Sequence, residues 1–245
     1  MMTKQDLLKL YLEKYIAPDG GGRLEPEDDR HSFSNSEIRT TNNENPILFL
    51  VQAAREFLIH FDYCYTIFKD AYERHMRSTE LVTGLHSRRD GDHFYISQSH
   101  DNIVAMMIGS FTFNSSYGEK IFHYGSKHGW VFNVKKIGDT ETLTHQLQGG
   151  DIAICYFATN RVPTLWHTLW LGIGLAISKT WNLADLRIQF LKEIIYKIPV
   201  NHRLILETAI EIHKWRRGPI RGNWAKEYYK PEHPVRRMIA CEYDE

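Results

Sequence analysis

Cysteine is scarce in this chain of 245 residues, which holds only Cys64, Cys155 and Cys241. The three lie far apart and form no Cys-x-x-Cys pair, so their spacing excludes a disulfide scaffold and a zinc finger. We therefore expect reduced thiols and synthesis inside a cell. The N-terminal stretch MMTKQDLLKL is charged and has no long apolar core, so we expect no signal peptide.

A net charge is also lacking, because 30 acidic residues balance 30 basic ones. Such a chain has no global field to attract nucleic acid or an anionic membrane. The basic, Trp-containing stretch at 213–224 has residue types that suit nucleic acid or a phosphorylated ligand, but in a neutral chain it is more typical of a surface packing segment. The longest apolar run, VPTLWHTLWLGIGLAI at 162–177, has an internal His and is too short for a membrane span. It predicts a central helix buried on most sides.

Specific catalytic and cofactor motifs are missing as well. The sequence has no His-Glu-x-x-His metal motif and no Gly-x-Ser-x-Gly nucleophile motif, and its 13 His residues are scattered. The glycines at 20–22 and 149–150 match no phosphate-loop spacing. The sequence therefore predicts neither a metal site nor a bound cofactor.

Helical periodicity, in contrast, runs through most of the chain. Thr3 and Asp6 form a capping-box-like start, Pro46 suits a first helical turn, and Ser99 precedes an apolar helix that continues to about residue 110. Asn182 and Asn201 are expected caps. Pro163 is expected to open the apolar helix. The further helical segments are expected at 3–16, 46–58, 62–77, 183–198 and 201–216.

The fold class that follows is all-α, with helical hairpins in an (α/α)-toroid-like or irregular bundle arrangement. Long polar connections at 17–45 and 79–99 join the helices, and a short hairpin is expected near 129–138 within the least clear region, 114–150. We expect one helical domain over 1–245, with a tail at 218–245 that wraps the surface. In a toroid alternate helices are parallel, so the inner ones start at the same rim.

Two polar clusters open apolar helices, at 42–45 and at 99–102, and a toroid would bring them to one rim. Carboxylates with Arg, His and Asn at such a rim are typical of glycan sites, since glycosidases need a protonated carboxyl beside an ionised one. Uronate lyases need a base and groups that neutralise the sugar carboxylate. The catalytic candidates are Glu44, His100 and Asp101. The substrate-binding candidates are Arg39, Asn43, Arg89, Asp92 and Asn102.

An ordinary structural interpretation stands beside this one. Ser, Asp and Asn before a helix are common caps, and an acidic first turn complements the helix dipole. This accounts for Ser99 and Asp101, and equally for Asn43 and Glu44. The charged residues at 88–92 could form a solvated turn around Asp90-Gly91, a frequent turn signal.

A resemblance to known proteins rests on three stretches of the sequence. They are NNENPILFLVQAAREFL, GLHSRRDGDHFYISQSHDNIVAMM and the later YYKPEHPVRRM at 228–238. Together they resemble a recurrent pattern in uncharacterised tailed-bacteriophage proteins. Those proteins look like (α/α) toroids related in shape to glycosidases and polysaccharide lyases. The resemblance implies that Glu44, Arg89, His100 and Asp101 line the toroid mouth.

Two functions follow and stay open at this point. One is a phage virion-associated structural or interaction protein, whose partners are other virion proteins or further copies of itself. The other is a glycan-processing enzyme, a glycoside hydrolase or polysaccharide lyase with a carboxylate, His and Arg pocket. The resemblance implies synthesis in the host cytoplasm and, for the first function, a later place in the virion. The assembly hypothesis also predicts a large apolar or aromatic surface patch.

Overall fold

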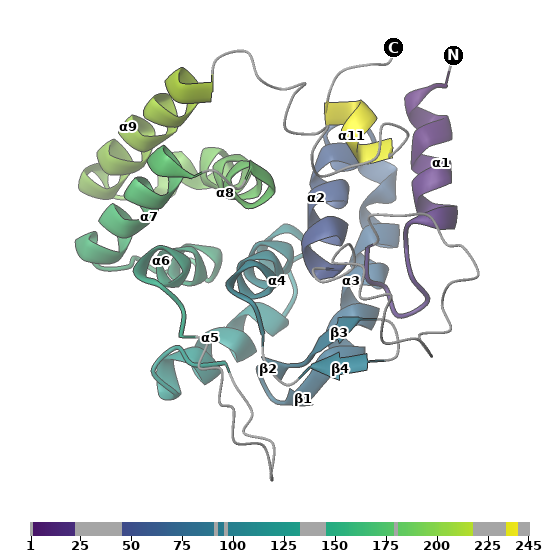
Figure 1. Cartoon of the computed structure of the whole chain (residues 1–245), viewed down its shortest axis with the longest axis horizontal. Helices are drawn as coiled ribbons and strands as arrows, with labels where there is room; N and C mark the ends of the chain where they lie inside the picture. The colour runs from purple at the N-terminus through teal and green to yellow at the C-terminus, as the bar shows by residue number, and fades with distance from the viewer. Residues whose placement is uncertain are drawn as a thin grey trace, which may run out of the picture. The chain divides into compact units, whose positions relative to one another are not determined.

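The computed structural model describes residues 2–22, 46–90, 93–95, 98–132, 146–178, 181–217 and 234–239. These residues are mostly helical with little strand, which confirms the all-α class (Figure 1). The chain divides into two compact units. One holds Met1–Thr79, Arg88–Tyr95 and Pro219–Glu245, and the other holds Glu80–Ser87 and Ile96–Gly218. The toroid-like arrangement and the single domain stay predictions.

The first unit is built from helices and one short hairpin. The Thr3 hydroxyl accepts a hydrogen bond from the Asp6 amide, and the Asp6 carboxylate accepts one from the Thr3 amide, so the predicted capping box is confirmed. The helix predicted from Pro46 is also confirmed. The elements are α1 (Lys4–Lys14), α2 (Pro46–Leu58), the 3₁₀ turn η2 (Asp62–Cys64), α3 (Tyr65–Thr79), β3 (Arg88–Asp90), β4 (His93–Tyr95) and α11 (Pro234–Ile239).

Aromatic side chains form the core of the first unit. Tyr11 of α1 is fully buried, and its ring packs at a tilt against Phe57 of α2 and Phe68 of α3. Its hydroxyl donates a hydrogen bond to the Phe49 carbonyl at 3.4 Å. Gly20 adopts a φ of +93°, and a Cβ there would lie 1.9 Å from the Ala71 carbonyl oxygen. The first glycine of the Gly20–Gly22 run therefore lets the chain return closely along α3.

The C-terminal tail contributes to this unit as well. Its described part, α11, packs against α1 and α2 with Val235 and Met238 buried. This segment was expected to wrap the surface, and here it forms a short helix. The rest of the tail lies outside the described residues.

The second unit is organised around α4, in which every residue from Asn102 to Ser110 is buried. Helices α5, α6 and α8 pack against it, and α7 packs against α6 and α9 (Figure 1). The elements are β1 (Glu80–Val82), β2 (Leu85–His86), α4 (His100–Thr112), α5 (Tyr117–Lys127), α6 (Gly149–Ala158), α7 (Leu165–Ile177), α8 (Trp181–Ile194), the 3₁₀ turn η3 (Ile195–Lys197) and α9 (Val200–Arg217).

Strand occurs only as short antiparallel pairs within the described ranges. β1 pairs with β2, with Glu80 opposite His86, and β3 pairs with β4, with Arg89 opposite Phe94. Both pairs lie in the segment 79–99 that was predicted as a plain polar connection. Most of the hairpin expected at 129–138 lies outside the described residues, although Val131 forms an isolated antiparallel bridge with Gln146.

The prediction that Asn182 and Asn201 cap helices is wrong, because both helices begin before these residues. α8 begins at Trp181 and α9 at Val200, so Asn182 and Asn201 lie inside their helices rather than before them. The preceding residue, Trp181 or Val200, is already helical in both cases, which leaves each Asn without the extended backbone of an N-cap.

Candidate functional site

The first turn of α4 carries three of the predicted site residues, His100, Asp101 and Asn102. Ser99 has an extended backbone, and its hydroxyl accepts a hydrogen bond from the Asn102 amide at 3.2 Å. This is the geometry of an N-cap, so the prediction for Ser99 is confirmed. The cap uses only the side chain of Ser99. It therefore does not explain the next three side chains, whose roles must be judged from their own contacts.

Other predicted site residues are not described in the same detail. Arg89 lies in β3 of the first unit, opposite Phe94 of β4. The rim shared by residues 43–45 and 99–102 therefore stays a prediction. The predicted residues outside the described ranges are Arg39, Asn43, Glu44 and Asp92.

His100 forms a hydrogen-bonded ion pair with a residue that the sequence analysis did not select. Its Nδ1 lies 2.9 Å from Oδ2 of Asp151, in the first turn of α6. The Asp151 side chain is 6% exposed, while the His100 side chain is 27% exposed. The carboxylate of this pair is therefore buried, and the imidazole is partly open to water.

The second oxygen of Asp151 binds Arg187, from the middle of α8. Arg187 Nη2 donates to Oδ1, and the Arg187 side chain is 14% exposed. Asp151 also accepts a hydrogen bond from the Gln148 amide at 3.3 Å, as the third residue of the capping box of α6. One buried carboxylate thus joins α4, α6 and α8.

The contacts around Asp101 and Asp151 shift the pKa values of these two carboxyl groups in opposite directions. Burial alone would raise the pKa of Asp151, but the hydrogen bond from His100 and the charge of Arg187 outweigh it and lower that pKa. Burial raises the pKa of Asp101; Arg187 opposes this, and the Asp151 charge adds to it. The hydrogen bond to Asp151 raises the pKa of His100.

Two carboxyl groups whose pKa values are driven apart are the equipment of acid–base chemistry. Asp101 is the group favoured as a proton donor, Asp151 stays ionised, and His100 can exchange a proton with water through its exposed side. The same contacts also serve as a clamp between three helix segments. The cluster of His100, Asp101, Asp151 and Arg187, called the α4–α6–α8 cluster below, is compatible with both roles.

Asn102 has a structural contact of its own. It is 1% exposed, and its Nδ2 donates to Oε1 of the equally buried Gln98 at 3.1 Å. This contact turns the amide toward the segment before α4. It explains a polar residue at this position without reference to a substrate.

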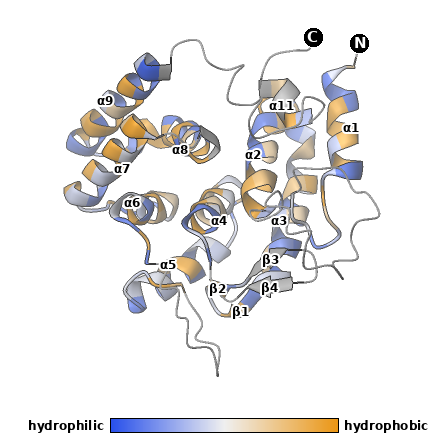
Figure 2. Ribbon diagram, in the orientation of Figure 1, coloured by the Kyte–Doolittle hydropathy of each residue, from blue (hydrophilic) through white to orange (hydrophobic). Residues whose placement is uncertain are grey.

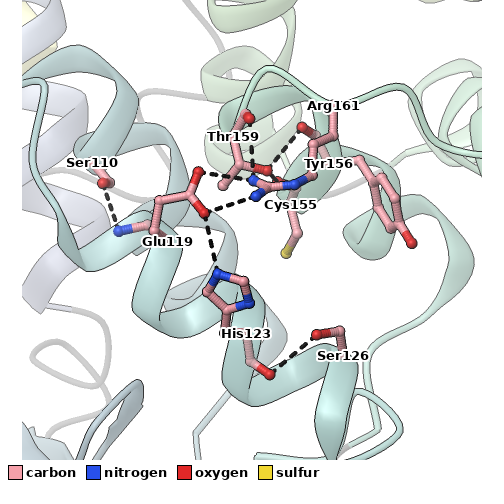
Figure 3. Close-up of polar contacts among 9 residues, drawn as sticks. Ser110, Glu119, His123, Ser126, Cys155, Tyr156, Thr159 and Arg161 are labelled. Atoms are coloured by element: carbon pink, nitrogen blue, oxygen red, sulfur yellow. Dashed lines mark hydrogen bonds and ion pairs between the residues drawn. The ribbon is translucent and has the colours of Figure 1, made fainter.

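A second polar site lies between α5 and the end of α6 (Figure 3). The Glu119 carboxylate accepts hydrogen bonds from both terminal nitrogens of Arg161, at 2.8 and 3.0 Å, and lies 3.7 Å from Nε2 of His123. The Arg161 guanidinium is also 4.4 Å from the centre of the Phe122 ring. Glu119 and Arg161 are too exposed to contribute more than a modest surface ion pair.

The apolar helix α7 is attached by one side only. Thr168 Oγ1 lies 2.8 Å from Nδ1 of His202, and His213 Nδ1 donates to the Leu175 carbonyl at 2.9 Å, both on α9. Leu171 is fully buried on this same side. In Figure 2, where orange marks hydrophobic residues, α7 can be followed beside α6 and α9.

The opposite side of α7 is an exposed apolar surface, called the α7 face below. Its side chains are between 39% and 61% exposed. The prediction that this helix is buried on most sides is therefore wrong. Helices α6 and α9 leave these side chains at least 39% exposed, although Trp170 lies against Gly149 of α6. The uniform hydrophobicity of the sequence carries no information about which side is covered. The α7 face consists of Leu165, Trp166, Leu169, Trp170, Ile173 and Ile177.

Comparison with family models, with characterised proteins and with solved structures gives no match. The resemblance to tailed-phage proteins rests on the sequence patterns and stays a prediction. Among the described residues, no group of three or more His, Cys, Asp or Glu side chains is placed to hold a metal ion. None of the described helices has the length and apolar character needed to cross a membrane.

Two residues of the α4–α6–α8 cluster were missed by the sequence analysis, and each had a local signal. Asp151 is the only charged residue among the ten of α6, GGDIAICYFA. Arg187 lies one helical turn after Leu183 and close to one turn before Phe190, both buried in α8. A charged residue within an apolar stripe indicates a buried partner.

Proposed function

We propose that this protein is a structural or interaction component of an assembly, with the virion of a tailed phage as the setting that the sequence resemblance implies. The α7 face is the observation that carries the proposal. Six large apolar side chains on one helix form a contiguous stripe, and such stripes in soluble proteins mark interaction surfaces. Aromatic residues at its centre, Trp166 and Trp170, are the type enriched in protein interfaces.

The composition of α7 strengthens this proposal. The helix carries no Asp, Glu, Lys or Arg, and His167 is its only ionisable side chain. Surface helices normally alternate apolar and charged faces. A helix that is apolar on both its covered and its open side is typical of one that receives a second layer of protein.

The test is incorporation into particles of the phage that encodes the chain. Trp166→Glu places a charge on the α7 face, and we expect it to reduce the amount of this protein in purified particles by about tenfold or more. The matched control is Tyr196→Glu, which puts the same charge at an aromatic residue 85% exposed in η3. We expect the control to incorporate normally. Absence of the wild-type chain from purified particles would overturn the virion assignment.

The glycan-processing enzyme remains as a second candidate because of one observation. Asp101 and Asp151 lie in one cluster, with the pKa of Asp101 raised by burial and that of Asp151 lowered by His100 and Arg187. Glycoside hydrolysis uses one protonated and one ionised carboxyl group in this way.

Activity against a panel of neutral and uronate-containing polysaccharides tests the second candidate. The enzyme hypothesis expects turnover by the wild type and loss of turnover in Asp101→Asn, with the melting temperature nearly unchanged. A cap or clamp role expects no turnover in either protein and a lower melting temperature for the variant.

A further inference from the structure

Four of the six side chains of the α7 face are arranged symmetrically along the helix. Trp166 and Ile177 lie equally far from a midpoint between residues 171 and 172, and so do Trp170 and Ile173. These four positions map onto one another when the helix is reversed about that midpoint. An interface related by a two-fold axis needs a surface that is complementary to itself in this sense.

The two halves of the face also differ in size in a complementary way. The N-terminal half presents Trp166, Leu169 and Trp170, while the C-terminal half presents Ile173, Gly174 and Ile177. A Cβ built at Gly174 meets nothing within 4 Å, so this position is a hollow in the open side of the helix. Reversal about the midpoint places Leu169 of one helix opposite Gly174 of the other, so a large residue meets a small one.

Charge and area are consistent with pairing between identical surfaces. An uncharged helix brings no like charges together when it meets a copy of itself. Two Trp residues and four Leu or Ile residues at these exposures leave roughly 600 Å² of apolar surface open. Val162, 53% exposed just before the helix, adds to this. Two such surfaces approach the lower end of the range, about 1,200 Å² in total, found for specific protein interfaces.

We propose that two copies of this chain pair through the α7 face, with the two helices antiparallel and a two-fold axis passing between residues 171 and 172. Trp166 then packs on Ile177 of the partner subunit, and Trp170 on Ile173 of the partner subunit. The inference rests on the proposed function, because it names a second copy of the chain as the partner of the same surface.

Sedimentation equilibrium of the full chain tests the pairing and its register together. We expect a concentration-dependent dimer for the wild type and a dissociation constant raised by about tenfold or more in Trp166→Glu and in Ile177→Lys. The double variant Trp166→Glu/Ile177→Lys places opposite charges face to face across the axis and should recover most of the lost affinity. Trp166→Glu/Ile173→Lys has the same charges in the wrong register and should not recover it.

Gly174→Leu separates weakened pairing from misfolding. Replacement of this helical glycine favours the helix of the single chain, and nothing in the described residues obstructs the new side chain. The variant fills the hollow that receives Leu169 of the partner subunit, so we expect an unchanged or higher melting temperature at low concentration with a weaker dimer. A wild-type dimer affinity in Gly174→Leu would overturn the proposed register.

The outcomes for self-pairing and for the proposed function are distinguishable. A wild-type chain that stays monomeric at the highest attainable concentration overturns self-pairing. If Trp166→Glu still abolishes incorporation into particles in that case, the assembly function stands with a different partner. A dimer that shows the expected charge exchange but is absent from particles supports self-pairing and overturns the virion assignment. Binding of the α7 face to phosphatidylcholine vesicles by a monomer overturns self-pairing in favour of a lipid surface.

Discussion

Asp151 and Glu119 are both carboxylates with an Arg partner, and they differ in burial. Asp151 is 6% exposed, whereas the Glu119 side chain is 49% exposed. Removing one partner of a buried ion pair leaves the other charge without compensation, while an exposed pair is replaced by water. The free energy of unfolding should therefore respond very differently to the same chemical change at the two sites.

We expect Asp151→Asn to lower the free energy of unfolding by about 3 kcal/mol. Glu119→Gln, the matched exposed change, should lower it by about 1 kcal/mol or less. Urea unfolding of both variants gives the comparison. The double variant Asp151→Asn/Arg187→Met should recover part of the loss, because it removes the charge left behind. Equal losses at the two sites would contradict the clamp role of Asp151.

His100 makes the stability of the second unit dependent on pH. Its hydrogen bond to Asp151 raises its pKa from the ordinary value of 6.5, so the stabilisation is complete below that value and is lost as the pH rises through the folded-state pKa. The pKa of Asp151 is lowered from 3.8, so its contribution is present above that value and is lost as the pH falls through the folded-state pKa.

The effect of His100→Gln on the melting temperature should therefore be largest near pH 5, which lies between these two titrations, and smaller near pH 9. The charge of His100 also opposes the raised pKa of Asp101, so its removal should add to the effect at pH values where His100 is charged. His123→Gln, at a 72% exposed side chain beside Glu119, is the control, and its effect should be small at both pH values. A loss for His100→Gln that does not vary with pH would argue against the ion pair.

Two of the local caps were predictable from the sequence, and contacts between distant residues were not. The Thr3–Asp6 capping box and the Ser99 cap involve residues three apart, so the sequence contains all the information needed. Asp151 joins residues 100 and 187, whose separation gives no sign of contact. The glycan-site prediction selected His100 and Asp101, which both lie at the start of α4. Their buried partners, Asp151 of α6 and Arg187 of α8, became visible only in the structure.

At the scale of elements, α7 contains two glycines that meet opposite surroundings. A Cβ at Gly172 would lie 2.9 Å from Cγ2 of Ile205 on α9, whereas a Cβ at Gly174 would meet nothing within 4 Å. The first glycine permits close packing of α7 on α9, and the second lies on the open side. Substitution by Ala at the two positions should change stability in opposite directions.

We expect Gly172→Ala to lower the free energy of unfolding by about 1–3 kcal/mol, because the added methyl overpacks the contact with α9. Gly174→Ala should raise it by up to about 1 kcal/mol through helix propensity. Both substitutions remove the same backbone freedom, so each is the control for the other in thermal unfolding at low protein concentration. A similar loss at both sites would mean that the open side of α7 is covered.

The elements that were missed have weak or misleading patterns. α5, within the region 114–150, contains Gly118 and Gly125, which lower helix propensity, so its buried stripe of Tyr117, Ile121 and Phe122 was not recognised as a helix. The strands β1, β2, β3 and β4 are only two or three residues long, so no alternation could be recognised. α7 was found as a helix, yet its burial depends on neighbours that hydrophobicity does not identify.

At the scale of the whole molecule, the all-α class followed from periodicity because most described residues belong to helices of ten residues or more. The toroid concerns how all of these helices are placed in the chain as a whole, and it stays a prediction. A polar rim was expected to be the functional surface. The structure adds an apolar surface on α7, and the assembly hypothesis predicted a patch of this type.

Self-pairing through the α7 face has a consequence for the stability of the whole protein. A dimer of folded chains is favoured by mass action, so its melting temperature should rise with concentration. At protein concentrations above the dissociation constant, each tenfold rise in concentration adds about 0.7 kcal/mol per chain to the free energy of unfolding. This corresponds to a rise in melting temperature of about 2 °C for a protein of this size. Trp166→Glu should abolish this dependence, while Tyr196→Glu should retain it. Calorimetry over a hundredfold range of protein concentration measures how the melting temperature depends on concentration. A wild-type melting temperature that does not change over this range would contradict self-pairing through the α7 face.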